Sequence, residues 1–523
     1  MNDNLAKLIG RIYAARVSRR SFMGGAAAVG ALATMGAPTG AAAEPVKGGI
    51  LKMGLGGGES TNSLDPAVAQ SQVTFHINRI IGEPLVDVAA DGTLEMRIAE
   101  AIESSPDAKV WRFTIRKGVK FHNGAELTPD DVLKTLERHS NKESSSGAFG
   151  IMENIQSMRV DGDVVEVTMD TGNADLPYLM ADYHLQIQPG GGMENPADGI
   201  GCGPYKVVVN EPGVRHTFEK HAEYWDETRG HYDGVEITVI NDATARMAAV
   251  QSGQVHIANR VDPKIAKLLT RAPGLTVRNA PGRGHYVFIM HCDTAPFDNA
   301  DLRRALKLAI NREELVDKIL DGFGSVGNDT PINAAYPLFT PLEQRKFDVA
   351  AAAEAYKASG HDGSPIILRV ADGAFPGAVD AAALFQQTAQ AAGIPLEIKR
   401  EPNDGYWSEV WNKQPFCASY WGGRPVQDQM FSTAYVSTAD WNDTRFFNPE
   451  FDALVEEARA ELDEAKRVEI YAKLSQMVHD DGGLICPMFN DFIEAVSDKV
   501  QGWEVNGMQE AMNGLAPHKT WLA

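Results

Sequence analysis

One short segment of the sequence combines residue types that bind small molecules. Tyr420 to Asp428 has the sequence Y-W-G-G-R-P-V-Q-D, and the run before it is typical of a strand. The aromatic rings offer flat apolar faces, and the two glycines let backbone come close to a ligand. The guanidinium of Arg424 can pair with a carboxylate or phosphate at two points. Loops at the end of a sheet often carry binding sites, so we expect a ligand here; the alternative is an exposed loop with incidental charges.

The expected ligand contacts in this segment are Tyr420, Trp421, Arg424 and Asp428. Two interpretations of Asp428 stay open: it receives a cationic end of the ligand, or it pairs with Arg424. Weaker candidates come from other parts of the chain, and the aromatic residues among them fit a core equally well. These weaker candidates are Thr61, Asn62, His285, Tyr286 and Trp407, the last in a cluster with Tyr406 and Trp411.

Motifs for catalysis and for metal binding are missing from the sequence. It contains no G-x-S-x-G, no G-x-x-x-x-G-K-[ST] and no H-E-x-x-H, and its 13 histidines are scattered. The four cysteines form no C-x-x-C, so we expect neither a metal site nor a cofactor. Cys202, Cys292, Cys417 and Cys486 lie among apolar neighbours, and the sequence does not decide between disulfides and free thiols. A binding protein is favoured over an enzyme.

The first 43 residues have the order of a secretory signal. Arg19 and Arg20 precede a weakly apolar run from Gly24 to Met35, and Ala41–Ala43 gives an A-x-A cleavage site. The apolar run is too short and too rich in glycine and alanine to span a bilayer. The arginine pair indicates export by the Tat route. We therefore predict a periplasmic protein, cleaved after Ala43.

Length and charge limit what the exported chain can be. Residues 44–523 exceed what one hydrophobic core serves, so two or three domains are expected. The full chain has a net charge of −21, and removing residues 1–43 leaves −25. Such a surface repels nucleic acid and anionic lipid, and we expect a monomeric protein with no nucleic-acid partner.

Hydrophobic periodicity indicates a mixed α/β protein. Residues 279–284 (N-A-P-G-R-G) are expected to link two halves, and residues 451–479 are read as one helical segment. A β-α-β unit is expected where two strands flank a helix that ends before Gly393. The expected strands are 50–55, 111–116, 164–169, 206–209, 234–240, 286–290, 366–370 and 395–399, and the expected helices are 302–310 and 379–392, with another opened by Thr128-Pro129.

A series of short motifs, in order along the chain, resembles the bacterial family 5 extracellular solute-binding proteins, the peptide, nickel and opine class that supplies ABC importers. The longest is W-R-F-T-I-R-K-G-V-K-F-H-N-G at residues 111–124. The others are G-G-I-L at 48–51, L-D-P at 64–66, G-P-Y at 203–205, Y-W at 224–225, A-P-F-D at 295–298 and R-A-L-K-L-A-I-N-R at 304–312. Each is weak alone, but together they cover nearly the whole exported chain.

The resemblance implies a two-lobed periplasmic binding protein fold with a ligand cleft between lobes that close about a hinge. Domain I would comprise residues 44–75, 195–282 and 490–523, with domain II inserted at 76–194, and domain III at 283–489 would be the second lobe. The implied function is capture of a peptide-like or other small polar solute and its delivery to an ABC permease and ATPase complex. Alternatives are a periplasmic hydrolase on an α/β frame and a ligand receptor for a membrane sensor.

The sequence departs from the peptide-binding pattern at one position. Peptide binders of the resembling family usually carry an aspartate three residues after the tryptophan equivalent to Trp421, where it reads the α-amino group. This chain has Arg424 there. Because a guanidinium repels an ammonium and pairs with acidic groups, the departure favours a ligand with an acidic group.

Overall fold

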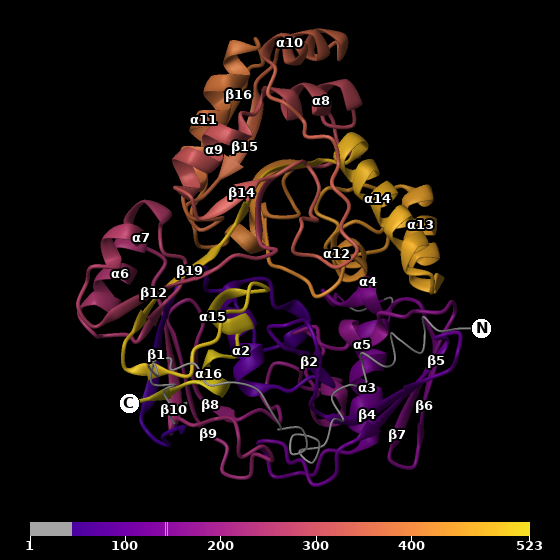
Figure 1. Ribbon diagram of the computed structural model, residues 1–523, viewed down its shortest axis with the longest axis vertical. Helices are drawn as coiled ribbons and strands as arrows, with labels where there is room; N and C mark the ends of the chain where they lie inside the picture. The colour runs from indigo at the N-terminus through magenta and orange to yellow at the C-terminus, as the bar shows by residue number, and fades with distance from the viewer. Residues whose placement is uncertain (1–43, 142, 144) are drawn as a thin grey trace, which may run out of the picture.

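The computed structural model describes residues 44–141, 143 and 145–523; the predicted signal segment therefore lies outside the described residues. The described chain forms an α/β protein built on three larger sheets (Figure 1). Two short ribbons accompany them: β2 (Val86–Val88) with β3 (Leu94–Met96), and β20 (Val500–Gln501) with β21 (Trp521–Leu522). No helix in this described part is long and apolar enough to cross a membrane.

The first sheet has seven strands from distant parts of the chain, in the order β12-β19-β11-β1-β10-β9-β8. It is mixed, because β1 runs parallel to β10 and β11 while the remaining pairs are antiparallel. Its strands are β1 (Ile50–Leu55), β8 (Tyr205–Glu211), β9 (Arg215–Lys220), β10 (Gly234–Val239), β11 (Ile257–Ala258), β12 (Leu275–Ala280) and β19 (Phe492–Ser497). Helices α2 (Gln72–Ile81), α6 (Ala243–Gln251) and α7 (Pro263–Leu269) accompany this sheet.

The second sheet is antiparallel and comes from one continuous stretch. Its order is β4-β5-β7-β6, with β4 (Ala99–Ser104), β5 (Val110–Ile115), β6 (Ile155–Asp161) and β7 (Val164–Met169). Helix α3 (Pro129–Ser140) packs on β6 and β7. Thr128 caps α3 as its sequence predicts, accepting from the Asp131 amide while the Asp131 side chain accepts from the Thr128 amide. Short helices α4 (Phe149–Met152) and α5 (Leu176–Leu179) follow.

The third sheet has six strands in the order β14-β18-β13-β17-β15-β16. All six residues of β13 are buried, as befits a central strand. The strands are β13 (His285–Met290), β14 (Gly324–Val326), β15 (Ile366–Val370), β16 (Leu396–Arg400), β17 (Phe416–Trp421) and β18 (Leu484–Asn490). The helices are α8 (Ala300–Ala309), α9 (Arg312–Leu315), α10 (Val349–Ala358), α11 (Ala378–Ala391), α12 (Gln427–Ala434), α13 (Pro449–Ala460) and α14 (Glu464–Asp481).

The predicted strands are present, but one predicted helix is wrong. Residues 451–479 do not form a continuous helix: α13 ends at Ala460, and α14 begins at Glu464. Asp463 has extended backbone angles and caps α14 through its side chain. Because an N-cap residue cannot be helical, Asp463 separates the two helices. The predicted β-α-β unit is present as β15, α11 and β16, with the two strands parallel.

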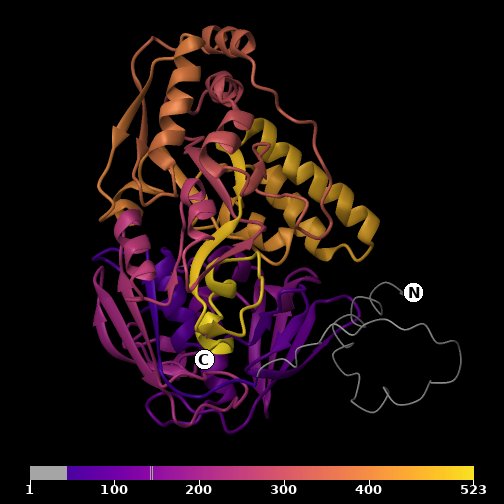
Figure 2. The ribbon, with the colours of Figure 1, turned by 60° about the vertical axis from the view of Figure 1, so that its left-hand side comes forward.

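The chain passes between the first and third sheets at two points. Residues 281–284 join β12 to β13, and Asp491 joins β18 to β19, the yellow ribbon that runs down the centre of Figure 2. Gly282 packs against Gly507 so tightly that a Cβ on Gly282 would lie 1.8 Å from the Gly507 carbonyl oxygen. The C-terminal segment therefore lies directly on the first crossover.

Candidate functional site

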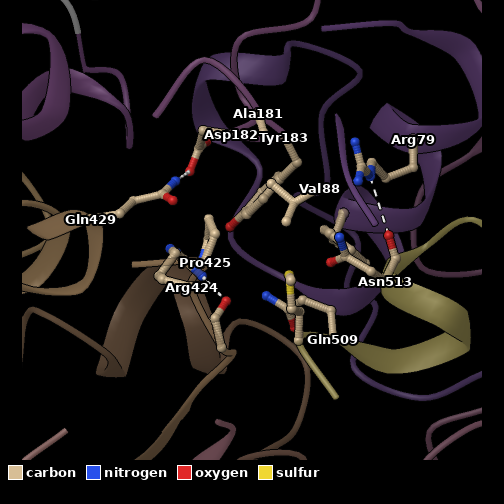
Figure 3. A pocket seen from close by; sticks show the side chains of 13 residues that line it. Arg79, Val88, Ala181, Asp182, Tyr183, Arg424, Pro425, Gln429, Gln509 and Asn513 are labelled. Carbon is tan, nitrogen blue, oxygen red and sulfur yellow. Dashed lines mark hydrogen bonds between the residues drawn. The ribbon is translucent and has the colours of Figure 1, made fainter. Parts of the chain in front are cut away.

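A cavity with two adjoining compartments lies where the third sheet faces the rest of the molecule. Both compartments are lined by Phe75, Tyr183, Arg424 and Gln509. One mixes polar and apolar side chains and is seen in Figure 3; it adds Arg79, Val88, Ala181, Asp182, Gly423, Pro425, Gln429, Met508 and Asn513. The other is mainly aromatic; it adds Gln70, Ser71, Gln72, Trp407, Trp411, Tyr420, Trp421, Gly422 and Trp441. Their volumes of about 30 and 40 Å³ leave room for a few waters.

Strand β17 and the loop after it place Arg424 in this cavity. β17 pairs with β13 on one side and β15 on the other, and it ends at Trp421. The loop backbone then packs against the C-terminal segment, where the Gly423 amide donates to the Met508 carbonyl at 2.7 Å. A Cβ on Gly422 would lie 2.0 Å from the Gln509 side-chain nitrogen. The two glycines thus permit a close backbone approach to Met508 and Gln509.

Arg424 is a buried cation without a carboxylate partner. Its side chain is 4% exposed, and it donates to the carbonyls of Gly422 (3.5 Å) and Gly423 (3.2 Å). Throughout residues 44–523 as described, no carboxylate comes within ion-pair distance of Arg424, and its Nε has no hydrogen-bond partner. The guanidinium carbon lies 5.8 Å and 5.9 Å from the ring centres of Tyr183 and Trp421. An unpaired buried charge is costly, so an anionic ligand group would supply what the protein lacks.

The acidic side chain that lines the cavity with Arg424, Asp182, is already committed to other partners. Asp182 accepts from His184 Nδ1 at 2.5 Å. It also accepts from Gln429 Nε2 at 2.8 Å (Figure 3). Despite burial, the hydrogen bonds from His184 and the guanidinium charge of Arg424 help to hold the pKa of Asp182 below its usual range. Asp182 is therefore an ionised carboxylate with its hydrogen-bonding oxygens occupied, which leaves Arg424 available to a ligand.

The aromatic compartment is walled by tryptophans packed edge to face. Trp411 lies 5.4 Å from Trp441 and 6.1 Å from Trp421, measured between ring centres. Trp407 lies 5.1 Å from Tyr420 at an interplanar angle of 86°. Such a wall suits the flat or apolar part of a ligand.

Five predicted site residues lie outside the cavity: Thr61, Asn62, His285, Tyr286 and Asp428. Thr61 is exposed and Asn62 half-buried, and both hydrogen-bond to Glu59 within their own loop. His285 is buried, donates from Nδ1 to the Arg283 carbonyl, and has its pKa lowered to about 4 by burial. Tyr286 stacks on Phe375 with ring centres 4.4 Å apart. Tyr420, Trp421, Trp407 and Arg424 do line the cavity.

Asp428 does not pair with Arg424. Its Oδ1 accepts from Arg459 Nε at 2.8 Å and from the Ser432 hydroxyl at 3.0 Å, and both members of the ion pair are buried. The physical reason is that α12 begins at Gln427, so Asp428 is carried on a helix that faces α13. The sequence interpretation that coupled Asp428 with Arg424 is wrong.

Several cavity residues were missed by sequence reasoning. Trp441 lies in A-D-W-N-D-T, a loop of turn-forming residues around one aromatic, which is the same kind of signal as the 420–428 loop. All ten residues of α2, including Gln72, are buried, but a helix buried on every side has no periodicity that reveals it. Gln509 and Tyr183 carry no local signal and enter the cavity only through the fold.

A larger groove of about 860 Å³ adjoins the cavity at Pro425. On one side it is lined by residues near the second sheet, such as Leu94 and Tyr178, and on the other by residues near the third, such as Leu338 and Tyr471. Contacts between the second-sheet side and the third-sheet side include an ion pair of Arg467 with Asp175 and the hydrogen bonds Gln429–Asp182 and Ala174–Arg459. Two other contacts, Lys264–Asp380 at 2.8 Å and Ser60–Asp404, join the part around the first sheet to the part around the third.

With this geometry known, comparison with known proteins decides the family. Residues 93–443 match the family described as bacterial extracellular solute-binding proteins, family 5, middle. The chain belongs to family 5 of the bacterial extracellular solute-binding proteins. Such proteins are the substrate-binding components of ABC importers, and this chain is one of them.

Curated relatives of this family 5 protein span most of its length. It is 23% identical to the periplasmic oligopeptide-binding protein OppA of Haemophilus influenzae, covering 83% of this chain and 87% of that protein. It is also 23% identical to the glutathione-binding protein GsiB of Pectobacterium atrosepticum, covering 86% and 90%. These relatives are transport binding proteins, and they indicate a periplasmic location.

Solved structures show the two-lobed periplasmic binding protein fold. The binding protein AgaA of Agrobacterium tumefaciens R10, solved with agropinic acid, aligns with a TM-score of 0.82 at 23% identity, covering 91% of this chain and 99% of that chain. DppA of Helicobacter pylori, solved with the peptide STSA, aligns with a TM-score of 0.83 at 20% identity, covering 91% and 98%. The fold class predicted from the sequence is confirmed.

Proposed function

We propose that this protein captures an acidic, peptide-like or opine-like solute between its two lobes and delivers it to an ABC permease and ATPase complex. The observation that carries the proposal is Arg424, buried in the cavity without a carboxylate partner among the described residues. Two comparisons support the ligand class: one relative binds glutathione, and one structural neighbour was solved with agropinic acid. Both of those compounds carry acidic groups.

Lobe closure is the second part of the proposal. The domain bounds expected from the sequence (44–75, 195–282 and 490–523; 76–194; 283–489) stay a prediction, and the crossovers at 281–284 and Asp491 would serve as the hinge. The small cavity around Arg424 fits a closed state of the two lobes. A solute would enter after the lobes open, and the cavity would have to enlarge to hold it. We further propose that the protein acts as a monomer and does not turn its ligand over.

The experiment is to identify what the native protein carries. Protein purified from its own periplasm should release a small molecule with at least one acidic group, detected by mass spectrometry. Added back, that compound should raise the melting temperature, since a hundredfold excess over Kd contributes about 2.7 kcal/mol. Release of a purely cationic or neutral compound would overturn the acidic-ligand proposal, and consumption of the compound by pure protein would favour the hydrolase alternative.

Export by the Tat route is proposed from Arg19 and Arg20, which lie outside the described residues. The variant with Arg19→Lys and Arg20→Lys should accumulate as precursor in the cytoplasm, because the signal is read through this arginine pair. Cell fractionation and intact-mass measurement test both the route and cleavage after Ala43. Undiminished mature protein in the periplasm of the variant strain would exclude the Tat proposal.

A further inference from the structure

Behind the tryptophan wall lies a buried carboxylate with no place in the ligand contacts described above. Asp443 follows Trp441 in the loop between α12 and α13, and its side chain is 1% exposed. Its Oδ2 accepts the indole N–H of Trp411 at 2.9 Å and that of Trp421 at 3.1 Å. One carboxylate oxygen thus holds two rings that come from different parts of the chain.

The two indoles that Asp443 holds face the candidate cavity. Trp411 and Trp421 both line its aromatic compartment, and their ring centres lie 6.1 Å apart. Trp421 also lies beside the anion-binding candidate, with its ring centre 5.9 Å from the guanidinium carbon of Arg424. A carboxylate that fixes the indole nitrogen of Trp421 therefore also fixes the ring face that Trp421 presents to Arg424. The cation–π attraction between the guanidinium and the ring depends on that orientation.

A core role alone does not account for this arrangement. A tryptophan N–H can be satisfied by a neutral carbonyl, as Trp111 shows by donating to the Ala108 carbonyl at 3.0 Å. Burying a carboxylate instead is expensive, and Asp443 Oδ1 has no hydrogen-bond partner in the described part of the chain. Charge-assisted bonds to both indoles give a stronger and more directional hold than neutral acceptors would.

We propose that Asp443 is a positioning residue, which orients Trp411 and Trp421 so that the aromatic wall and Arg424 together accept the ligand. The ligand-binding part of this inference rests on the proposed function. The orientation of the two indoles by Asp443 does not depend on it. Asp443 would touch neither the solute nor Arg424; it acts through the indoles.

Ionisation of Asp443 gives this arrangement a signature. The titratable and charged groups that face Asp443 are Arg445 from its own loop, Cys417 from β17 and Tyr435 from the end of α12. Burial raises the pKa of Asp443 to about 7, and it also raises the pKa values of the Cys417 thiol and the Tyr435 hydroxyl. Within this group only Asp443 changes charge between pH 5 and pH 8.

The test reads the two indoles directly in the full-length exported protein labelled with 5-fluorotryptophan. Trp411→Phe and Trp421→Phe assign their fluorine resonances. In wild type both resonances should shift with pH with a common midpoint near 7, and in Asp443→Asn both should be displaced and lose that midpoint. The control is Asp440→Asn, an exposed aspartate of the same loop, which should leave both unchanged. The wild-type titration needs no variant, so the test stays decisive even if Asp443→Asn folds poorly. The proposal is overturned if neither fluorine resonance of wild type, or only one of them, responds to pH.

The stability of the two proteins should diverge with pH in a fixed direction. The pKa of Asp443 is higher in the folded state than in the unfolded state, so this group favours folding at low pH and loses that contribution as pH rises through about 7. The melting temperature of Asp443→Asn relative to wild type should therefore be higher at pH 8 than at pH 5. The same difference at both pH values would count against an ionising Asp443.

A binding measurement separates this inference from the proposed function. The compound identified by mass spectrometry from the native protein is titrated into wild type and Asp443→Asn by calorimetry. An affinity at least tenfold weaker in the variant supports the positioning role. An affinity within threefold of wild type overturns the positioning role of Asp443 and leaves the acidic-ligand proposal intact. A released compound without an acidic group overturns the acidic-ligand proposal and leaves the positioning role intact.

Discussion

Arg424→Ala should weaken ligand binding by about thirtyfold to several thousandfold. If the ligand places an anionic group against Arg424, removing the guanidinium leaves that group buried without a partner. Truncating one side of such a pair costs roughly 2–5 kcal/mol, and each 1.4 kcal/mol is a factor of ten in affinity. Arg424→Lys should recover only part of the loss, since an ammonium cannot make the planar two-point contact. Calorimetric titration of the compound released from the native protein measures the change.

The structure suggests a matched control for Arg424. Arg400 at the end of β16 has a side chain 65% exposed and pairs with Asp372 on the surface, so Arg400→Ala removes the same charge away from the cavity. It should leave the affinity unchanged. If Arg424→Ala binds within threefold of wild type and keeps its circular dichroism spectrum, the buried guanidinium is not an anion receptor.

The second large effect concerns stability. Asp428→Ala should lower the free energy of unfolding by about 3–5 kcal/mol, because it leaves Arg459 buried without its counter-ion. Replacing both residues, as in Asp428→Leu with Arg459→Met, should cost less than the single change, since no buried charge then remains. Urea unfolding followed by tryptophan fluorescence compares the variants.

The comparison for Asp428 is an exposed ion pair. Lys134 and Asp130 on α3 have side chains 44% and 60% exposed, and Asp130→Ala should change stability by about 1 kcal/mol at most. An equally small effect of Asp428→Ala would mean that Asp428 does not serve as the partner of Arg459. A large loss of ligand affinity with unchanged stability would return Asp428 to the ligand site.

Local patterns in the sequence predicted much of the fold. Strand β15, helix α11 and strand β16 each carry their own periodicity between clear turn residues, so their bounds differ little from the structure. The break at residues 461–463 was missed because helical periodicity continues across it, although Asp463 before Glu464 is an N-cap signal. The two-lobed arrangement came from the family resemblance, since β1 and β10 pair across a long sequence separation that no local pattern encodes.

The candidate site was predictable only in part, for the same reason. The loop around Arg424 has the composition of a binding loop, and it does line the cavity. Gln72, Tyr183 and Gln509 arrive from three other regions, and only the packing of the whole chain brings them together. The sequence left the partner of Asp428 open and offered only Arg424, which is near in sequence, whereas Arg459 on α13 is near in space.

The strand order has a consequence for how this chain folds as it is made. β18 lies between β14 and β13, and β19 lies between β12 and β11, so both large sheets need strands from the last forty or so residues. The four-stranded sheet alone comes from one continuous early stretch, residues 99–169. Domains form as units from the N-terminal side during synthesis, at about 5–20 residues per second. The ribosome must therefore release almost the entire chain before either large sheet is complete, and an unfinished polypeptide offers solute no enclosed cavity.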